Sequence, residues 1–378
     1  METATRRLIG VLFVLFALAG PGVALAEEYL VAAELALTGT YAWVGVPSRD
    51  GMLIGLDEVN RSGILGSSKI KLIVEDTASD KRQAITLLSR FESRDKALLV
   101  LGPSSSTEGL AIAPVANDIK IPMLTTTAVS EEINKSGIWA YKTPASPSVI
   151  IGAAAKYAVD KLGIKTVALV FGRDNDGQVG QKNVALNYFK SHGVKILAEE
   201  SVLTTDTDYL ALLTKITSLN PEAMFLALTG EQAANFIVQA RQGGIDPKTR
   251  FIGVPNMGSD QFINIGGKAV EGALFVADYF PGQQSAENQR FVQAYEPKHG
   301  RKPDNGAALG YTAIKIAAAA IKAAGQNPTR DSIREALKKI KNLPVILGTG
   351  QFSFDENRGA NYEGIMLTVK DGKFVPLQ

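Results

Sequence analysis

Short apolar runs alternate with amphipathic helical stretches along most of this 378-residue chain. The strand-like runs are residues 29–37, 70–75, 97–101, 121–124, 166–171, 195–202, 223–228, 251–254 and 274–279. Helical patterns lie between them at residues 48–61, 80–94, 107–118, 149–162, 178–192, 209–219 and 231–242. A strand followed by a helix, repeated, predicts parallel sheets covered by helices on both faces, so the fold class is α/β.

A single sheet holding all of these strands would be unusually wide, so we expect two sheets in two lobes. The polar stretch 142–147 contains two prolines and is the best candidate for the first crossing between the lobes. Proline favours extended backbone at its own position and at the residue before it, which suits a stiff connection. An ordinary surface loop remains the alternative for this stretch.

The N-terminus has the order of a secretory signal peptide. Arg6 and Arg7 precede an apolar run at residues 8–19, which a break and the small-residue segment 24–26 follow. A membrane anchor is the alternative, but the apolar run is shorter than the roughly 20 residues that span a bilayer. We therefore expect export with cleavage after Ala26, and because the sequence has no cysteine, no lipid anchor.

The charge pattern disfavours several partners. The full chain carries a formal net charge of +2, with acidic and basic side chains mixed throughout. Neither nucleic acid nor an anionic membrane surface is expected as a partner, because no long basic run is present.

Catalytic and cofactor-binding signatures are absent from the sequence. Its two histidines, His192 and His299, each lie before a glycine in a polar helical tail, where a surface histidine is the usual interpretation. There is no Walker A motif, no dinucleotide fingerprint and no nucleophile elbow. We expect no enzyme activity, no cofactor and no metal site.

Hydroxyl side chains gather where two predicted strands end. Ser104, Ser105 and Ser106 follow the run 97–101, and Thr125 and Thr127 follow the run 121–124. Ligands of parallel sheets bind beyond the carboxyl ends of the strands, so both loops are candidate binding loops. Serines at a helix start can hold a ligand carboxylate, or they can simply cap the helix, and the sequence leaves both open.

Two aromatic residues, Tyr41 and Trp43, follow the first predicted strand in what we expect to be a loop. They suit an aromatic wall over an apolar ligand. Ordinary packing beneath the loop is the alternative.

Several segments resemble the leucine/isoleucine/valine-binding protein family of ABC importers. They are residues 35–39, 76–80, 101–107, 279–281 and 352–355, and their order and spacing carry the resemblance more than any one motif does.

The resemblance implies the type I periplasmic binding fold, with two doubly wound lobes joined by three crossing segments near residues 141–143, 277–279 and 351–354. It implies an N-terminal lobe of residues 27–143 with 278–350, and a C-terminal lobe of residues 144–277 with 351–378.

In amino-acid-binding members, the two hydroxyl loops hold the ligand carboxylate. Here Val129 replaces the family's second-loop threonine, for which Thr127 is the substitute. Asp176 and Thr229 align with two aromatic positions of the second lobe, and Asn256 lies where a carboxylate normally pairs with the ligand ammonium. An enclosed ammonium without an anionic partner is costly. Either Asp176 or Asp260 replaces that partner, or the ligand has no ammonium.

The resemblance therefore implies a monomeric periplasmic protein that binds a small molecule and delivers it to an ABC permease in the inner membrane. The expected ligand is a small organic carboxylate, either an aromatic acid or a hydrophobic amino acid, with a slight preference for an aromatic acid over a standard branched-chain amino acid. A ligand-binding module that reports to a membrane sensor is the rival function, because the same fold serves both.

Overall fold

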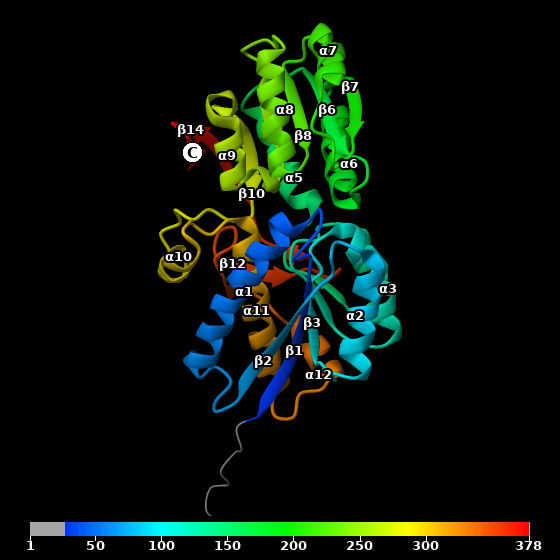
Figure 1. Ribbon diagram of the computed structural model, residues 1–378, viewed down its shortest axis with the longest axis vertical. Helices are drawn as coiled ribbons and strands as arrows, with labels where there is room; N and C mark the ends of the chain where they lie inside the picture. The colour runs from blue at the N-terminus through cyan, green and yellow to red at the C-terminus, as the bar shows by residue number, and fades with distance from the viewer. Residues whose placement is uncertain (1–26, 378) are drawn as a thin grey trace, which may run out of the picture.

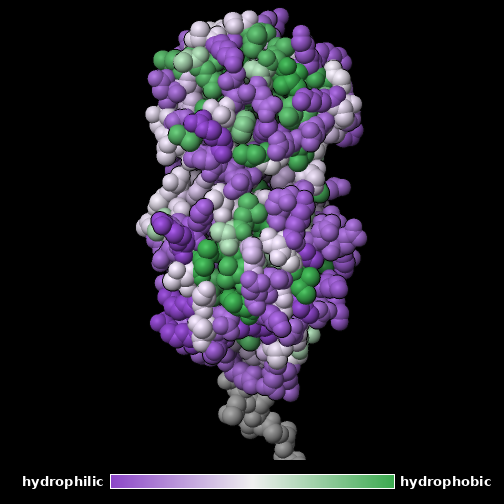
Figure 2. Space-filling model, turned by 90° about the vertical axis from the view of Figure 1, so that its right-hand side faces the viewer, coloured by the Kyte–Doolittle hydropathy of each residue, from purple (hydrophilic) through white to green (hydrophobic). Residues whose placement is uncertain are grey.

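The computed structural model describes residues 27–377 as two halves stacked along the long axis of the molecule (Figure 1). The predicted signal peptide and its cleavage site after Ala26 lie outside these residues. A waist separates the two halves in the space-filling view, where most of the surface is hydrophilic (Figure 2).

The lower half of Figure 1 contains a sheet of five parallel strands in the order β2-β1-β3-β4-β5. The strands are β1 (Glu28–Leu35), β2 (Lys69–Asp76), β3 (Leu99–Leu101), β4 (Met123–Thr125) and β5 (Ala140–Lys142). The helices that alternate with them are α1 (Ala42–Ser62), α2 (Lys81–Ser93), α3 (Ser106–Asp118) and α4 (Glu132–Lys135).

Strand β1 shows why both faces of this sheet are covered. Val31 and Ala33 belong to one apolar cluster, which contains residues of α1, whereas Ala32 belongs to another, which contains residues of α2 and α3. Successive side chains of a strand point to opposite faces, so the apolar run at residues 30–33 requires helices on each side.

The upper half contains a sheet of seven strands in the order β15-β14-β10-β9-β8-β6-β7, of which β6 to β10 run parallel. The strands are β6 (Thr166–Gly172), β7 (Lys195–Val202), β8 (Ala223–Ala227), β9 (Arg250–Gly253), β10 (Leu274–Ala277), β14 (Ile365–Lys370) and β15 (Lys373–Pro376). The helices are α5 (Pro147–Asp160), α6 (Asp176–Ser191), α7 (Leu210–Leu219), α8 (Gly230–Gln242) and α9 (Asp260–Gly266), with short 3-10 turns at Pro255–Met257 and Gly267–Val270.

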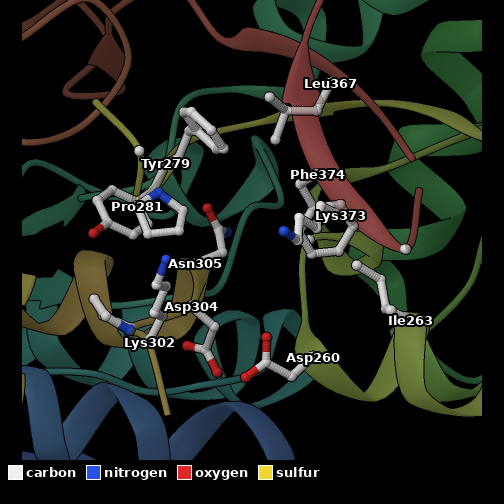
Figure 3. A pocket seen from close by; sticks show the side chains of 15 residues that line it. Asp260, Ile263, Tyr279, Pro281, Lys302, Asp304, Asn305, Leu367, Lys373 and Phe374 are labelled. Atoms are coloured by element: carbon white, nitrogen blue, oxygen red, sulfur yellow. The ribbon is translucent and has the colours of Figure 1, made fainter. Parts of the chain in front are cut away.

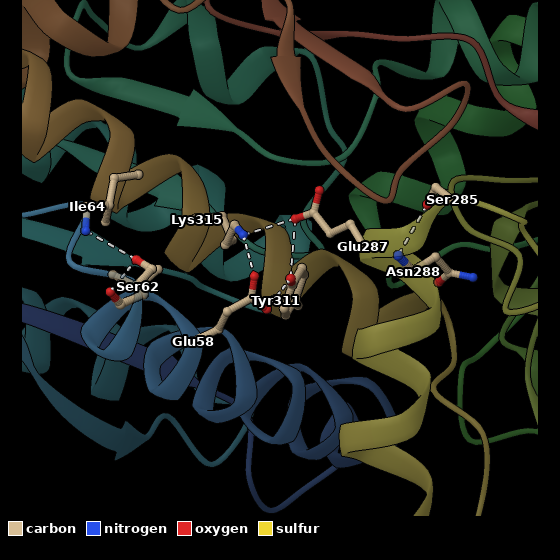
Figure 4. Close-up of polar contacts among 9 residues, drawn as sticks. Glu58, Ser62, Ile64, Ser285, Glu287, Asn288, Tyr311 and Lys315 are labelled. Atoms are coloured by element: carbon tan, nitrogen blue, oxygen red, sulfur yellow. Dashed lines mark hydrogen bonds and ion pairs between the residues drawn. The ribbon is translucent and has the colours of Figure 1, made fainter.

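Three later helices return to the lower half: α10 (Ala286–His299), α11 (Asn305–Ala324) and α12 (Arg330–Lys338). Helix α11 packs backbone to backbone against α1, because a Cβ atom on Gly51 would lie 1.9 Å from the Ala307 carbonyl oxygen and one on Gly310 would lie 1.9 Å from that of Ser48. At the edge of this contact Lys315 Nζ lies 3.0 Å from a carboxylate oxygen of both Glu58 and Glu287 (Figure 4).

By length and composition, α11 is the one helix among residues 27–377 that could cross a membrane. However, 72% of its apolar window is buried in the fold, which is typical of the core helix of a globular domain. Its near-continuous alanine and isoleucine content also hides the amphipathic period, so the sequence patterns above did not predict it.

The chain passes between the two halves three times: after β5, after β10, and before β14. Strand β12 (Gln351–Phe354), near the expected third crossing, lies in a small sheet with β11 (Leu343–Pro344) and β13 (Ala360–Asn361). The chain then joins the larger sheet at Ile365. The exact boundaries of the lobes stay a prediction.

All nine predicted strands and all seven predicted helices are present, and the α/β class with two parallel-stranded sheets is confirmed. One prediction is wrong, because Trp43 does not lie in a loop: α1 begins at Ala42, with Tyr41 as its N-cap residue. Gly45 permits this early start, since a Cβ atom there would lie 1.9 Å from the Ala36 carbonyl oxygen. The helix then continues through Pro47.

Candidate ligand-binding site

The candidate site lies between the two sheets, at the carboxyl ends of their parallel strands. In the first sheet the strand order changes direction between β1 and β3, and in the second it changes between β6 and β8. Loops that leave neighbouring strands in opposite directions form a crevice at such a point, where ligands of open α/β sheets bind. The predicted hydroxyl loops follow β3 and β4, which are paired neighbours.

Ser104 and Ser106 have hydroxyl protons available for a ligand. Ser104 Oγ accepts a hydrogen bond from the Ala36 N–H at 3.1 Å, and Ser106 Oγ accepts from the N–H groups of Val129 and Ser130, both at 3.1 Å. A hydroxyl that is held as an acceptor still has its own proton to donate. Both serines line the same small chamber, so they can present two donors to an anionic group. The other described residues that line this chamber are Tyr41, Trp43, Val44, Ser105, Thr127, Val129, Asn175, Gly177, Gln178, Gln181 and Asn256.

Ser105 plays a different part, since it is the N-cap of α3 in a complete capping box. Its Oγ accepts from the Glu108 N–H and donates to Glu108 Oε2 at 2.7 Å, while its own N–H donates to the same carboxylate. Because its one hydroxyl proton is donated to Glu108, Ser105 has none left to donate to a ligand. The capping alternative therefore describes Ser105 but not its two neighbours.

The two threonines of the second loop also differ. Thr127 lines the chamber, and its hydroxyl donates to the Ser104 carbonyl oxygen at 2.6 Å, which ties the two loops together. Thr125 is fully buried, donates to the Ala128 carbonyl oxygen at 3.0 Å and does not line the chamber. Thr125 thus shapes the loop from beneath.

Tyr41 and Trp43 reach the chamber from the start of α1. The Tyr41 hydroxyl accepts a hydrogen bond from Asn175 Nδ2 at 3.1 Å, which joins the lower half to the upper half. Burial raises the pKa of Tyr41 to about 12, so this hydroxyl stays protonated and neutral at physiological pH. Trp43 Nε1 is buried and has no hydrogen-bond partner among the described residues.

The upper half presents the first turn of α6 to the chamber. Asn175 caps this helix by accepting from the N–H groups of Gly177 and Gln178. Gly177 allows a close approach, because a Cβ atom there would lie 2.7 Å from Ser106 Oγ. Gln178 and, one turn further, Gln181 line the chamber from the same face of the helix.

Of the remaining predicted residues of the upper half, only Asn256 lines the chamber. Its amide donates to the Leu228 carbonyl oxygen at 3.3 Å. Thr229 caps α8 by accepting from the Gln232 N–H and does not line the chamber. Asp176 is exposed, and its carboxylate accepts from Thr107 Oγ1 at 2.9 Å at the rim.

The chamber has a volume of about 50 Å³ and no charged side chain among its described lining residues. Toward solvent, Tyr41 and Ser105 also line an outer cavity of about 500 Å³. Another cavity of about 250 Å³ lies further along the interface, where Asp260 and Asp304 approach one another (Figure 3). Typical ligand pockets measure roughly 300–1,000 Å³, so the chamber is smaller than such a pocket and the outer cavity lies within the range.

Among the described residues that line the chamber, none is an aspartate or a glutamate. Neither Asp176 nor Asp260 lines the chamber. Asp304 borders the next small void, but its carboxylate is engaged by Arg301 at 2.8 Å and by the Ala307 N–H. The lining therefore suits a ligand that presents hydrogen-bonding groups without a cation.

Of the two histidines, His192 is exposed at the end of α6, as predicted. His299 is only partly exposed, because α10 packs against α1 and brings its Nδ1 within 3.4 Å of Asp50 Oδ2. No group of three or more histidine, aspartate or glutamate side chains is arranged to hold a metal ion within the described part of the chain.

The sequence patterns missed Asn175 and Gln181 as chamber residues. Both had a usable signal, because Asn175 stands at a helix start and Gln181 lies three residues after Gln178 on one helix face. The close approach of Gly177 to Ser106 had no signal in the sequence, because it depends on how the halves meet.

The sequence matches the periplasmic binding protein family over residues 31–373. The chain belongs to this family. The family resemblance predicted from the sequence is thereby confirmed.

One relative of this periplasmic binding protein is the leucine-, isoleucine-, valine-, threonine- and alanine-binding protein of Pseudomonas aeruginosa, which is 24% identical over 360 residues, with 94% of each chain covered. A leucine-binding protein from Thermotoga maritima has a TM-score of 0.85 at 28% identity, covering 93% of this chain and 98% of the other.

A solute-binding protein of an ABC transporter from Rhodopseudomonas palustris, in complex with 3,4-dihydroxybenzoic acid, has a TM-score of 0.84 at 24% identity. The alignment covers 93% of this chain and 96% of the other. At that identity the likeness shows a shared fold.

Proposed function

We propose that this periplasmic binding protein captures a small organic carboxylate between its halves and delivers it to an ABC permease in the inner membrane. The observation that carries the proposal is the chamber, which has serine hydroxyls from one sheet and side-chain amides from the other. Relatives named for leucine and for branched-chain amino acids support transport binding, and a fold neighbour in complex with a dihydroxybenzoate extends the range of ligands to consider.

The carboxylate would bind first on the lower half. Ser104 and Ser106 each have a free hydroxyl proton, and charge-assisted hydrogen bonds to a carboxylate are stronger than neutral ones. The start of α3 lies at the same loop, and the positive end of its dipole favours an anion.

The ligand would lack an ammonium group. The described chamber lining contains no aspartate or glutamate, and an enclosed ammonium without an anionic partner carries a heavy desolvation cost. Tyr41 and Trp43 offer aromatic surface instead. An aromatic acid therefore fits better than a branched-chain amino acid.

Closure of the upper half would exclude water from the bound solute. Two bonds between the halves, Asn175 to Tyr41 and Thr107 to Asp176, form across the cleft at 3.1 and 2.9 Å. A ligand that contacts both halves stabilises the closed form over the open one, and the permease would recognise that form.

Export with cleavage after Ala26, diffusion without a lipid anchor, a monomeric state and the absence of catalysis complete the proposal. The sequence signals for export, for free diffusion and for the absence of catalysis are, in that order, the basic and apolar N-terminus, the lack of cysteine, and the lack of any catalytic constellation.

The test is thermal unfolding of the purified exported protein with leucine, valine, benzoate, hydroxybenzoates and benzamide. A ligand that binds only the folded state raises the midpoint. We expect shifts with the aromatic acids and not with benzamide, which lacks the carboxylate. Shifts with leucine or valine alone would assign a standard branched-chain ligand, and recovery of a chemically altered ligand would contradict a pure binding function.

A further inference from the structure

Three polar atoms of residues that line the chamber have no hydrogen-bond partner among residues 27–377. Gln178 is 2% exposed, and neither its amide nitrogen nor its amide oxygen forms a hydrogen bond with any described residue. Trp43 Nε1 is buried at the same chamber and also lacks an acceptor. Buried polar groups are almost always paired, because leaving them unpaired is costly. Three at one cleft point to a ligand that satisfies them.

The Gln178 amide is held in a built position. Asn175 caps the turn that carries it and anchors that turn to Tyr41 across the cleft. At the end of β6, a Cβ atom on Gly172 would lie 1.9 Å from Gln178 Oε1. A glycine at position 172 therefore makes the space that the amide occupies, and the side chain is not a flexible surface glutamine.

The chemistry of these groups restricts what can bind them. A primary amide offers donors and an acceptor, so its complement must both accept and donate a hydrogen bond, whereas the indole N–H needs an acceptor. A hydroxyl or a carboxamide meets both requirements. An ammonium can only donate, and an alkyl group does neither.

We propose that Gln178 and Trp43 select a ligand whose end opposite the carboxylate carries a hydroxyl or a carboxamide. The inference rests on the proposed function and deepens it, because it names the second polar group of the same solute. Ser104 and Ser106 would bind the carboxylate from the lower half, and Gln178 would form hydrogen bonds with the distal group from the upper half.

The experiment is calorimetric titration of the exported protein with benzoate, 3-hydroxybenzoate, 4-hydroxybenzoate, 4-carbamoylbenzoate and leucine. The readout is the ratio of each affinity to that of benzoate, which a general loss of stability does not move. We expect at least one distally substituted acid to bind about 10- to 100-fold more tightly than benzoate.

Three variants locate the effect. Gln178→Met keeps the length of the side chain without its polar atoms and should reduce the ratio to near one while benzoate still binds. Trp43→Phe should reduce it partly. Gln232→Met is the matched control, because Gln232 is 4% exposed, donates to the Leu203 carbonyl oxygen and lies outside the chamber; its ratio should match that of the unaltered protein.

The outcomes separate the two proposals. Equal binding of benzoate and all substituted acids, or a ratio that survives Gln178→Met, overturns the role of Gln178 but leaves carboxylate capture intact. If leucine binds more tightly than every acid in the panel, the proposal of a distal hydroxyl or carboxamide on the ligand is wrong. Failure of every acid to bind overturns carboxylate capture itself, and the present inference with it.

Discussion

At the residue scale, identical side chains in one loop have different parts because their hydrogen-bond partners differ. Ser105 donates its hydroxyl proton to Glu108, whereas Ser104 and Ser106 accept backbone bonds and keep a proton to donate. The sequence shows three consecutive serines and predicts both capping and ligand binding for the group. Only the partners of each oxygen assign capping to Ser105 and leave the other two available.

The buried carboxyl group of Glu34 provides a pH-dependent prediction. Its side chain is fully buried, and neither carboxyl oxygen has a hydrogen-bond partner in the described part of the chain. Burial, with the nearby charge of Glu108, raises its pKa well above the ordinary value of 4.5. The folded state therefore keeps a proton that the unfolded state releases above pH 4.5. This contribution to stability is fully present below pH 4.5 and is lost as the pH rises through the folded-state pKa.

Glu34→Gln should remove that dependence, since a glutamine does not titrate. The free energy of unfolding of the unaltered protein, relative to the variant, should fall by on the order of 1 kcal/mol per pH unit above pH 4.5 until the folded-state pKa is passed. Urea denaturation between pH 4.5 and 8 measures it. Glu356→Gln, at an exposed position, is the control. Parallel curves for Glu34→Gln and the unaltered protein would contradict the prediction.

At the element scale, the first turn of α6 is the part of the upper half that meets the hydroxyl loops most closely. Gly177 would bring a Cβ atom 2.7 Å from Ser106 Oγ and 3.1 Å from Val129 Cγ2. Both of these contacts cross the cleft, whereas Asn175 Oδ1, also at 3.1 Å, belongs to the cap of the same helix. The tightest contact of this glycine is therefore the one between the two halves.

Gly177→Ala should therefore weaken ligand binding without lowering stability. Alanine is a better helix former than glycine, but its methyl group would obstruct closure at a cost of about 1–3 kcal/mol in binding free energy. Calorimetric titration with the ligand found in the panel, together with urea denaturation, measures both effects. Gly180→Ala is a matched control on the same helix, because a Cβ atom there meets nothing within 4 Å. Equal losses of affinity in both variants would show that the contact with Ser106 is irrelevant.

At the scale of the whole molecule, one buried network joins the three passages between the halves. Tyr362 donates its hydroxyl proton to Asp278 Oδ1 at 2.6 Å and accepts from the Ala145 N–H at 3.0 Å. Asn305 Nδ2 donates to the other oxygen of Asp278 at 3.1 Å. Segments from the first, second and third passages thus meet at two side chains that are each under 5% exposed.

Tyr362→Phe should destabilise the protein by about 1–3 kcal/mol, because it leaves a buried N–H and a buried carboxylate oxygen without their partner. Urea denaturation measures the change. Tyr295→Phe is the control, since the Tyr295 hydroxyl is buried without any described partner and its removal should be neutral or stabilising. If the Tyr362→Phe variant is as stable as Tyr295→Phe, the network does not stabilise the passages between the halves.

Most of the architecture could be predicted from local sequence patterns. The strands and helices that form the two parallel sheets follow from apolar runs and helical periods, since those depend on near neighbours in the chain. Some later elements were not predicted, and the reasons are also local. Helix α11 is apolar on nearly every side, and strands such as β11 and β13 have only two residues each.

By itself, the sequence determined the α/β class and the two hydroxyl loops that follow neighbouring strands. The tertiary structure decided that Trp43 belongs to a helix, that Asp176 and Thr229 lie outside the chamber, and that Gln178 is buried without a partner within it. The physical reason is that a helical period or a cap depends on residues near one another in the chain, whereas burial and hydrogen bonding across the cleft depend on how the two sheets meet.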